Sequence, residues 1–263
     1  MKPSRVLEYA GTVLLMLLAL GVLGSDRRAG DITRLESAEQ SYTLGIELVA
    51  REDFAAAKEK FRESAALLEA ELSHADSAGM HFNRANALLQ AGDVGDAIAS
   101  YRSAQLRAPA DTHIAANLAE ARSKVSRSLG APEPTALEQA CQLWAALSEQ
   151  TRLILVVVLS FTALLVSELR LRAVSLTLVV LAALSAGTVA ADIARRGSAN
   201  IGVISESTLL RKGNGDGFEQ VVAEPLPEGT ECRVRESRPG WIEVEIAGGT
   251  RGWVKDAAVT RVK

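Results

Sequence analysis

The predicted fold depends on two uncharged apolar runs, Leu153-Ile-Leu-Val-Val-Val-Leu-Ser-Phe-Thr-Ala-Leu-Leu-Val-Ser167 and Ala173-Val-Ser-Leu-Thr-Leu-Val-Val-Leu-Ala-Ala-Leu-Ser-Ala-Gly-Thr-Val-Ala-Ala191. The five residues between them, Glu168-Leu-Arg-Leu-Arg172, carry three charges. A single buried helix cannot hold such a cluster at its middle at low cost, whereas two helices that cross a bilayer can turn at its surface. The pattern therefore predicts a two-helix transmembrane hairpin over residues 152–192, which returns the chain to the side that it left.

The N-terminal segment predicts export of the chain that follows it. Residues 1–25 combine a basic start, Met1-Lys-Pro-Ser-Arg5, with the uncharged run Tyr9–Ser25. This arrangement is typical of a signal peptide, and an uncleaved N-terminal membrane anchor is an equal alternative. The arginines around the hairpin favour opposite orientations, so the N-terminal segment decides the topology. We therefore expect the N-terminus and the hairpin turn on the cytoplasmic side of the membrane and both soluble domains on the outer side.

Composition limits the class of partner. The chain has 263 residues, a net charge of −3 and 4% aromatic residues, and both soluble blocks mix the two signs of charge. Without a basic face, a nucleic-acid partner is not expected. The two cysteines, Cys141 and Cys232, are too few for a disulfide framework. A single bridge between them is one alternative, but the alternating pattern around Cys232 favours a buried strand residue.

Residues 31–128 contain two stretches that resemble each other, Tyr42–Phe61 and Phe82–Tyr101. Proline and glycine are rare there, and apolar residues recur three and four positions apart, which favours helices. A small residue, Gly45 or Ala85, stands at the same place in both stretches. Small residues at that place let two helices approach closely, so each stretch is expected to form a helical pair.

This pattern resembles the tetratricopeptide repeat, a helix–turn–helix unit of about 34 residues. The two stretches lie 40 positions apart, which indicates an insertion within residues 69–80. A further helix near residues 112–125 contains Asn117-Leu-Ala119 and matches half a repeat, which would cap the end of an all-α solenoid. A generic helical bundle is the alternative for the whole block.

The resemblance implies a partner-binding groove along the first helix of each repeat. Asparagine side chains in such a groove can pair with the backbone of an extended peptide. The alternative for Asn83 and Asn117 is that they only bridge neighbouring helices. The basic pair that clamps a C-terminal carboxylate in some members of the family is missing. The implied partner-binding positions are Tyr42, Ile46, Phe82, Asn83, Asn86 and Asn117.

Residues 129–150 are predicted to link the repeats to the hairpin. Pro132 and Pro134 exclude a helix at the start of this linker. Leu137–Glu149 is expected to form a short amphipathic helix next to the membrane. Trp144 on this helix suits the membrane interface, and packing against the repeat block is the alternative.

The spacing of apolar residues changes over residues 199–263 from a helical pattern to an alternating one. Short alternating runs are separated by glycine- and proline-containing turns about every ten residues, which predicts five or so strands and a small all-β barrel. The spacing of Gly240-Trp-Ile-Glu-Val-Glu245 and Gly252-Trp-Val254 is similar to the bacterial SH3 domain. Trp241 and Trp253 are candidates for a ligand platform, and core or rim packing is the alternative for each.

No catalytic site is predicted. His74 and His81 could share a helix face, but no cysteine or carboxylate pair completes a metal-ligand set there. Phosphate-binding loops, nucleophile elbows and zinc-protease motifs do not occur in the sequence. We therefore expect a non-enzymatic protein without a cofactor or a metal.

The order of parts is similar to BatE, the repeat-protein family of the Bat (aerotolerance) operons. That order is a signal peptide or anchor, tetratricopeptide repeats, a transmembrane hairpin and a bacterial SH3-like domain. The resemblance implies a membrane-anchored scaffold of the bacterial inner (cytoplasmic) membrane, with both soluble domains periplasmic. It implies von Willebrand factor A-domain proteins or other Bat-type envelope proteins of a MoxR-associated system as partners, besides the lipid bilayer. The alternative is an envelope sensor or recruiter whose SH3-like domain binds peptidoglycan.

Overall fold

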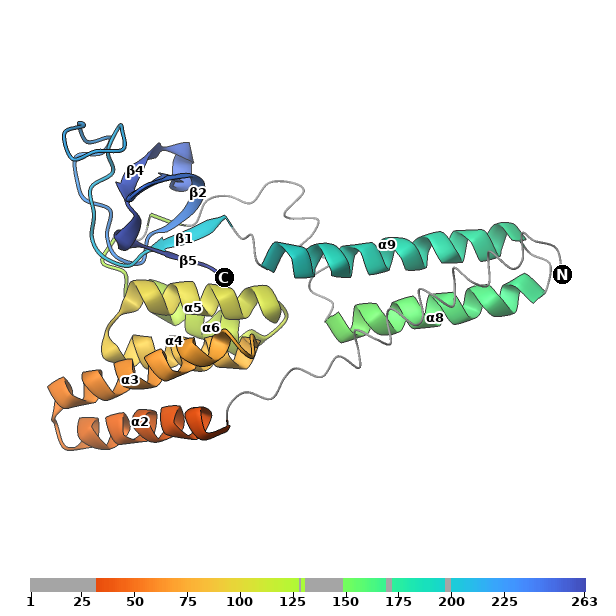
Figure 1. Ribbon diagram of the computed structural model, residues 1–263, viewed down its shortest axis with the longest axis horizontal. Helices are drawn as coiled ribbons and strands as arrows, with labels where there is room; N and C mark the ends of the chain where they lie inside the picture. The colour runs from red at the N-terminus through yellow and green to blue at the C-terminus, as the bar shows by residue number, and fades with distance from the viewer. Residues whose placement is uncertain (1–31, 128, 131–148, 169–171, 197–199) are drawn as a thin grey trace. The chain divides into compact units, whose positions relative to one another are not determined.

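The computed structural model describes residues 32–127, 129–130, 149–168, 172–196 and 200–263. These residues belong to two compact units, which are described separately (Figure 1). The larger unit holds five helices and a β-sheet, and the smaller one holds a pair of long helices. The predicted N-terminal segment 1–25, most of the linker 129–150, and Cys141 and Trp144 within it lie outside the described residues.

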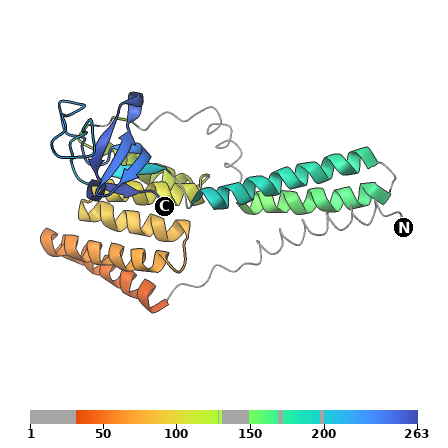
Figure 2. The same ribbon diagram turned by 45° about the horizontal axis from the view of Figure 1, so that its top comes forward.

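The larger unit begins with a helical array that we define as Ile32–Ser123. Helices α2 to α5 lie next to one another in chain order, and α6 packs against α5 (Figures 1 and 2). Side-chain oxygens of Asp53, Ser77 and Asp111 cap α3, α4 and α6, as a turn residue before a helix can. The helices are α2 (Ile32–Ala50), α3 (Phe54–Leu72), α4 (Ala78–Ala91), α5 (Val94–Arg107) and α6 (Thr112–Ser123).

The two helical pairs of the array use the same packing. Tyr42 meets Phe61 edge to face with ring centroids 5.3 Å apart, and Phe82 meets Tyr101 in the same way at 5.8 Å. Gly45 is required in the first pair because a Cβ there would lie 2.7 Å from the Phe61 ring. The equivalent contacts explain why the sequence of the two stretches is alike.

The predicted insertion is an extension of α3. Helix α3 has 19 residues whereas α5 has 14, and the loop after α3 is one residue longer than the loop after α5. These six residues account for the offset of 40 against about 34 for a tetratricopeptide repeat. The first residues of α4 and α6, Ala78 and Thr112, are 34 positions apart.

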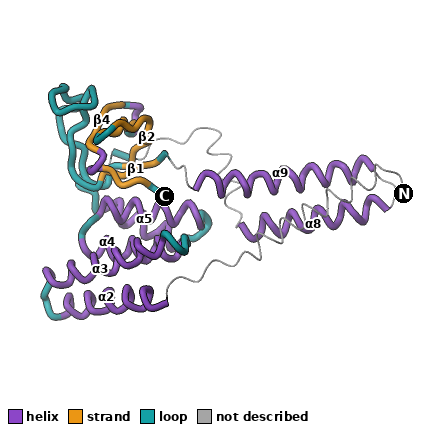
Figure 3. The backbone as a smooth tube through the Cα atoms, in the orientation of Figure 1, coloured by secondary structure: helices purple, strands orange, loops and turns teal. Residues whose placement is uncertain are grey.

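The second part of the larger unit is a five-stranded antiparallel sheet with the order β4-β3-β2-β1-β5. We call residues 200–263 the β module. A loop over residues 205–230 joins β1 to β2, and much shorter turns join β2 to β3 and β3 to β4 (Figure 3). The prediction of about five short strands is confirmed. The strands are β1 (Ile201–Ile204), β2 (Glu231–Arg238), β3 (Trp241–Glu245), β4 (Arg251–Lys255) and β5 (Val259–Arg261).

The β module has its own apolar core. Ile204, Leu210, Leu226, Ile242 and Val244 are fully buried in it. Cys232 is also fully buried, and its thiol donates to the carbonyl oxygen of Gly202 at 3.3 Å. The prediction that this cysteine is an inward-facing strand residue is confirmed. Burial raises the pKa of the Cys232 thiol to about 12, so the group stays protonated.

The helical array and the β module share one hydrophobic core. Val203 of β1 and Val262 after β5 are buried in the same cluster as Ile98 and Tyr101 of α5. At the start of α5 the two parts approach so closely that a Cβ on Gly95 would lie 2.3 Å from the carbonyl oxygen of Ile204. The sequence treats these parts as separate domains on either side of a hairpin, whereas the structure packs them into one unit.

Polar contacts across this boundary are complementary in charge. Glu231 of β2, with a side chain only 4% exposed, lies 2.8 Å from the Nε of Arg102 and accepts a hydrogen bond from the Nε of Arg122 at 2.7 Å. Glu228 accepts from the N–H of Gly95 at 2.8 Å and thereby caps α5, whose own N-cap residue Asp93 makes no such bond. The boundary therefore has a fixed register as well as an apolar core.

The smaller unit consists of α8 (Glu149–Glu168) and α9 (Arg172–Arg196). Val156, Ala163 and Ala182 are buried between them, and the hydroxyl of Ser175 donates to the carbonyl oxygen of Ala163 at 3.0 Å. The prediction of two consecutive helices that pack against each other is thus confirmed, but the prediction that they cross a membrane is wrong. None of the helices in the described ranges is both long enough and apolar enough to span a bilayer.

The physical reason lies in the length of the first run. Leu153–Ser167 contains 15 residues, which in an α-helix rise about 22 Å, against about 30 Å for the hydrocarbon core of a bilayer. Both helices of a transmembrane hairpin must be long enough to cross the bilayer, so one run that is too short excludes the hairpin. The predicted fold class, which included a transmembrane hairpin over 152–192, is corrected accordingly. The predicted inner-membrane localisation with periplasmic domains is corrected as well, because none of the described helices can span a bilayer.

Candidate binding site

Two asparagines join the first helices of neighbouring helical pairs in the array. The amide of Asn117 in α6 donates to Oδ1 of Asn86 in α4 at 3.1 Å. The buried hydroxyl of Tyr101 in α5 donates to the same oxygen at 2.5 Å. We call Asn86 and Asn117 the asparagine pair. Asn117 therefore bridges neighbouring helices, as the alternative to peptide binding predicted. Both members of the asparagine pair nevertheless remain partly exposed.

The bridging contacts fix how the asparagine pair presents its remaining groups. Two donors occupy Oδ1 of Asn86, so its amide N–H groups point elsewhere. Asn117 uses its amide nitrogen in the pair, which leaves its carbonyl oxygen as an acceptor. An amide donor and an amide acceptor side by side match the C=O and N–H groups of an extended polypeptide backbone.

The other predicted binding residues are on α2 and α4: Tyr42 and Ile46 belong to α2, and Phe82 and Asn83 belong to the same helix as Asn86. Tyr42 and Phe82 are half-buried against the core of the array, and their packing partners are Phe61 and Tyr101. Ile46 is 46% exposed. Asn83 is exposed on α4. We define Tyr42, Ile46, Phe82, Asn83, Asn86 and Asn117 as the array face; it combines partly exposed apolar groups with amides.

The charged group described near the asparagine pair is a carboxylate, Glu120, which a neighbouring lysine partly neutralises. Burial raises the pKa of the Tyr101 hydroxyl to about 12, and the Glu120 carboxylate adds to that rise. Tyr101 therefore remains a hydrogen-bond donor to Asn86 at any physiological pH. Glu120 is paired with Lys124 at 3.4 Å. This environment suits an uncharged backbone segment better than a terminal carboxylate.

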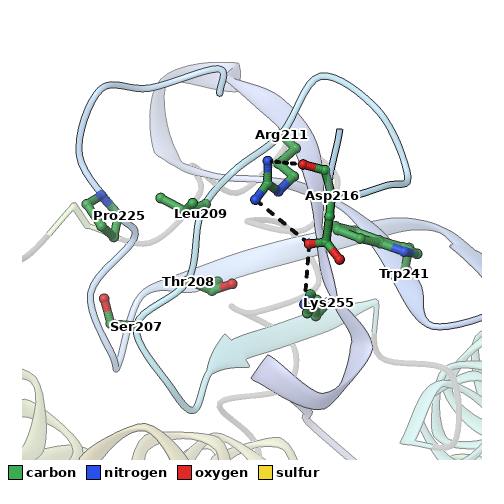
Figure 4. A pocket seen from close by; sticks show the side chains of 8 residues that line it. All are labelled: Ser207, Thr208, Leu209, Arg211, Asp216, Pro225, Trp241 and Lys255. Atoms are coloured by element: carbon green, nitrogen blue, oxygen red, sulfur yellow. Dashed lines mark hydrogen bonds and ion pairs between the residues drawn. The ribbon is translucent and has the colours of Figure 1, made fainter. Parts of the chain in front are cut away.

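A second candidate site is a pocket of about 270 Å³ on the β module (Figure 4). Trp241 lines it, together with residues that the sequence did not single out. Asp216 lies 3.8 Å from Nη2 of Arg211 and 3.3 Å from Nζ of Lys255, so one carboxylate faces two cations. The lining residues are Ser207, Thr208, Leu209, Arg211, Asp216, Pro225, Trp241 and Lys255.

Trp253 does not line this pocket, although its side chain is on the same sheet face as those of Trp241 and Glu243. The Trp253 side chain is 7% exposed, and the guanidinium of Arg238 stacks on its ring at 4.7 Å. Packing, the alternative considered for each tryptophan, therefore describes Trp253, whereas Trp241 lines the pocket.

The histidines do not form a chemical site in the described part of the chain. His81 is buried and pairs with Asp76 at 2.9 Å, while His74 and His113 are exposed. Burial lowers the pKa of His81 to about 4, and Arg107 and Arg84 contribute to the shift. Across residues 32–127, 149–168, 172–196 and 200–263, no three His, Cys, Asp or Glu side chains gather as metal ligands.

The pocket-lining residues that sequence reasoning missed come from segments that are far apart in the sequence. Arg211 and Lys255 reach the pocket from a loop and from β4, and 44 positions separate them. The glycine-rich stretch Gly213-Asn-Gly-Asp-Gly217 predicts a turn, and in the structure Arg211 donates to the carbonyl oxygen of Asp216 within it at 2.8 Å. No protein-family model, curated protein or solved structure matches the chain.

Proposed function

We propose that the chain is a non-enzymatic scaffold that binds an extended segment of a partner polypeptide on its array face. The observation that carries this proposal is the asparagine pair, in which Tyr101 and the bridging hydrogen bond orient an amide donor and an amide acceptor. Pre-oriented amides lower the entropic cost of binding a peptide backbone. The partly exposed apolar side chains of the array face supply contacts for the side chains of the partner.

The shared core of the larger unit supports this function. A scaffold has to hold its binding surfaces at a fixed distance, and the contacts of Glu231 and Glu228 tie the β module to α5 and α6. The array face and the β module then act as one body. A partner with two binding segments would gain effective concentration from that rigidity.

A photo-crosslinking amino acid at position 83 in producing cells tests the proposal, because Asn83 is exposed on the array face. We expect discrete adducts with one partner protein that Asn86→Asp abolishes. Aspartate keeps the oxygen that accepts from Tyr101 and Asn117 but lacks the amide donor. Gln40→Glu, an equal change of charge on an exposed residue of α2, is the matched control and should leave the adducts unchanged. Adducts that persist in Asn86→Asp would contradict the proposal.

The resemblance to the BatE family makes von Willebrand factor A-domain proteins the first partners to test. Co-purification of such a protein, dependent on Asn86, would support that part of the proposal.

The pocket on the β module favours a second candidate function, peptidoglycan binding. Its aromatic wall, Trp241, lies beside the hydroxyl-bearing residues Ser207 and Thr208 and a charged group at Asp216. Such a lining can hold a sugar or a short peptide stem. Sedimentation of the full chain with purified peptidoglycan tests this function. Binding that Trp241→Ala removes would support it, and a chain that stays in the supernatant would exclude it.

A further inference from the structure

Two cations in the pocket on the β module converge on a single carboxylate oxygen. Nη2 of Arg211 lies 3.8 Å from Oδ1 of Asp216, and Nζ of Lys255 lies 3.3 Å from the same oxygen (Figure 4). Both distances exceed the length of an ordinary N–H···O hydrogen bond, about 2.7–3.2 Å. The two cations therefore attract Asp216 without donating a hydrogen bond to it, and these donors remain available to a second anion.

The guanidinium of Arg211 is held in place by its surroundings. Its Nη1 donates to the carbonyl oxygens of Asp216 at 2.8 Å and of Phe218 at 2.9 Å. The backbone N–H of Arg211 donates to the carbonyl oxygen of Trp253 in β4 at 2.9 Å, and the N–H of Trp253 donates back at 2.7 Å. The Arg211 side chain is only 18% exposed. A cation that is fixed in this way loses little conformational entropy when it binds a ligand.

An apolar wall stands beside the two cations. Trp241 of β3 is directly opposite Lys255 of β4, so the two side chains are on the same sheet face. Trp241 and Leu209 are both half-buried, and both line the pocket. The pocket thus places two cationic donors next to apolar surface that a ligand can cover.

The charges that line the pocket do not balance. Arg211 and Lys255 share Asp216 as their carboxylate, which leaves an excess of one positive charge among the lining residues. The next ion pair on the same loop, Lys212 with Glu219 at 2.7 Å, is balanced and does not line the pocket. The excess of positive charge is therefore local to the pocket.

We infer that this pocket binds the free C-terminal carboxylate of a peptide whose last residue has an apolar side chain. The two oxygens of such a carboxylate can accept charge-assisted hydrogen bonds from Nη2 of Arg211 and Nζ of Lys255. Its single negative charge matches the excess of the pocket, and Asp216 acts as an internal competitor. The apolar side chain of the ligand covers Trp241. The inference deepens the second candidate function, on whose pocket it rests, by naming the group that is recognised.

NMR titration of the full chain with three small probes, followed at the indole N–H of Trp241, tests this inference. N-acetylleucine carries both the carboxylate and the apolar side chain. N-acetylleucinamide lacks the charge and should bind about tenfold more weakly, because it loses a charge-assisted hydrogen bond. N-acetylglycine lacks the side chain and should also bind about tenfold more weakly, because it leaves the apolar wall exposed to water.

Variants with matched charge changes separate the pocket from the net charge of the chain. Lys255→Gln should lower the affinity for N-acetylleucine by about tenfold, because it removes one charged donor. Asp216→Asn should raise the affinity by about threefold, because it removes the competing carboxylate. Lys212→Gln and Glu219→Gln make the same two changes of charge outside the pocket and should leave the affinity within about twofold.

Absence of N-acetylleucine binding, or equal affinity for N-acetylleucine and either of the other probes, would overturn the inference. Equal effects of Lys255→Gln and Lys212→Gln would overturn it too, since the response would then report only net charge. If Asp216→Asn fails to fold, Lys255→Gln still decides the matter, because the Lys255 side chain is 58% exposed. The peptidoglycan function can fail separately: a chain that binds N-acetylleucine but does not sediment with peptidoglycan would exclude that function and support the carboxylate site.

Discussion

Replacing Glu231 by glutamine should loosen the boundary between the helical array and the β module. The carboxylate is almost inaccessible and faces the guanidinium groups of Arg102 and Arg122. Removing one partner of a buried ion pair leaves an uncompensated charge and costs about 3–5 kcal/mol. Because Arg102 is 25% exposed and Arg122 is 39% exposed, water can partly replace the carboxylate. We therefore expect the lower end of that range, about 3 kcal/mol.

Hydrogen exchange measured by mass spectrometry follows this change without assuming that the whole chain unfolds in one step. A loss of about 3 kcal/mol corresponds to about 150-fold faster exchange of the most protected amides. The increase should appear in both α5 and β2, since the two elements meet at Glu231. Glu236→Gln, an exposed member of an ion pair on the same strand, is the control and should change exchange by less than about threefold.

The reasoning would be refuted by faster exchange in β2 alone, with α5 unaffected. That result would mean that the β module and the array are independent bodies that merely touch. An effect of Glu231→Gln no larger than that of Glu236→Gln would have the same meaning.

Two further predictions concern the stability of the larger unit. Gly95→Ala should lower the free energy of unfolding by about 2 kcal/mol, because the new methyl group would collide with the carbonyl oxygen of Ile204. Denaturant titration followed by tryptophan fluorescence measures this loss of stability. The pKa of His81 in the folded chain is about 4, below the ordinary 6.5. Between these two values the unfolded chain binds a proton that the folded chain does not, so the free energy of unfolding falls as the pH drops from 6.5 to 4. The free energy of unfolding should fall by about 3 kcal/mol, and by less in His81→Gln. Equal shifts of the denaturant midpoint between about pH 7 and pH 4.5 in both proteins would contradict this prediction.

Local pattern was sufficient to predict the helices of the array. The small residues at 45 and 85 and the aromatic residues at 61 and 101 recur because each helical pair packs in the same way. The asparagine pair was partly predictable, since Asn86 and Asn117 were placed on the groove side by analogy with the repeat. The contact of Tyr101, whose hydroxyl donates to Asn86, was not predictable, because a repeat pattern gives no information on where that hydroxyl ends.

The shared core of array and β module could not be predicted from alternation along a strand. Glu231 and Cys232 are adjacent in β2 and both are buried, because the core of the β module covers one face of the strand and helices α5 and α6 cover the other. Alternation predicts which residue faces the core of the β module but not what lies on the opposite face. The membrane hairpin failed for a different reason: the absence of charge in a run does not show that the run is long enough to match the thickness of a bilayer.

The affinity of the array face for the polypeptide segment identified by crosslinking tests the central claim most directly. Fluorescence anisotropy with a labelled peptide of that segment gives Kd for the parent chain, for Asn86→Asp and for Gln40→Glu. The account predicts that Asn86→Asp weakens binding by at least about tenfold, the value of one lost backbone hydrogen bond, while the unfolding free energy stays unchanged. Equal affinity in all three proteins would contradict it.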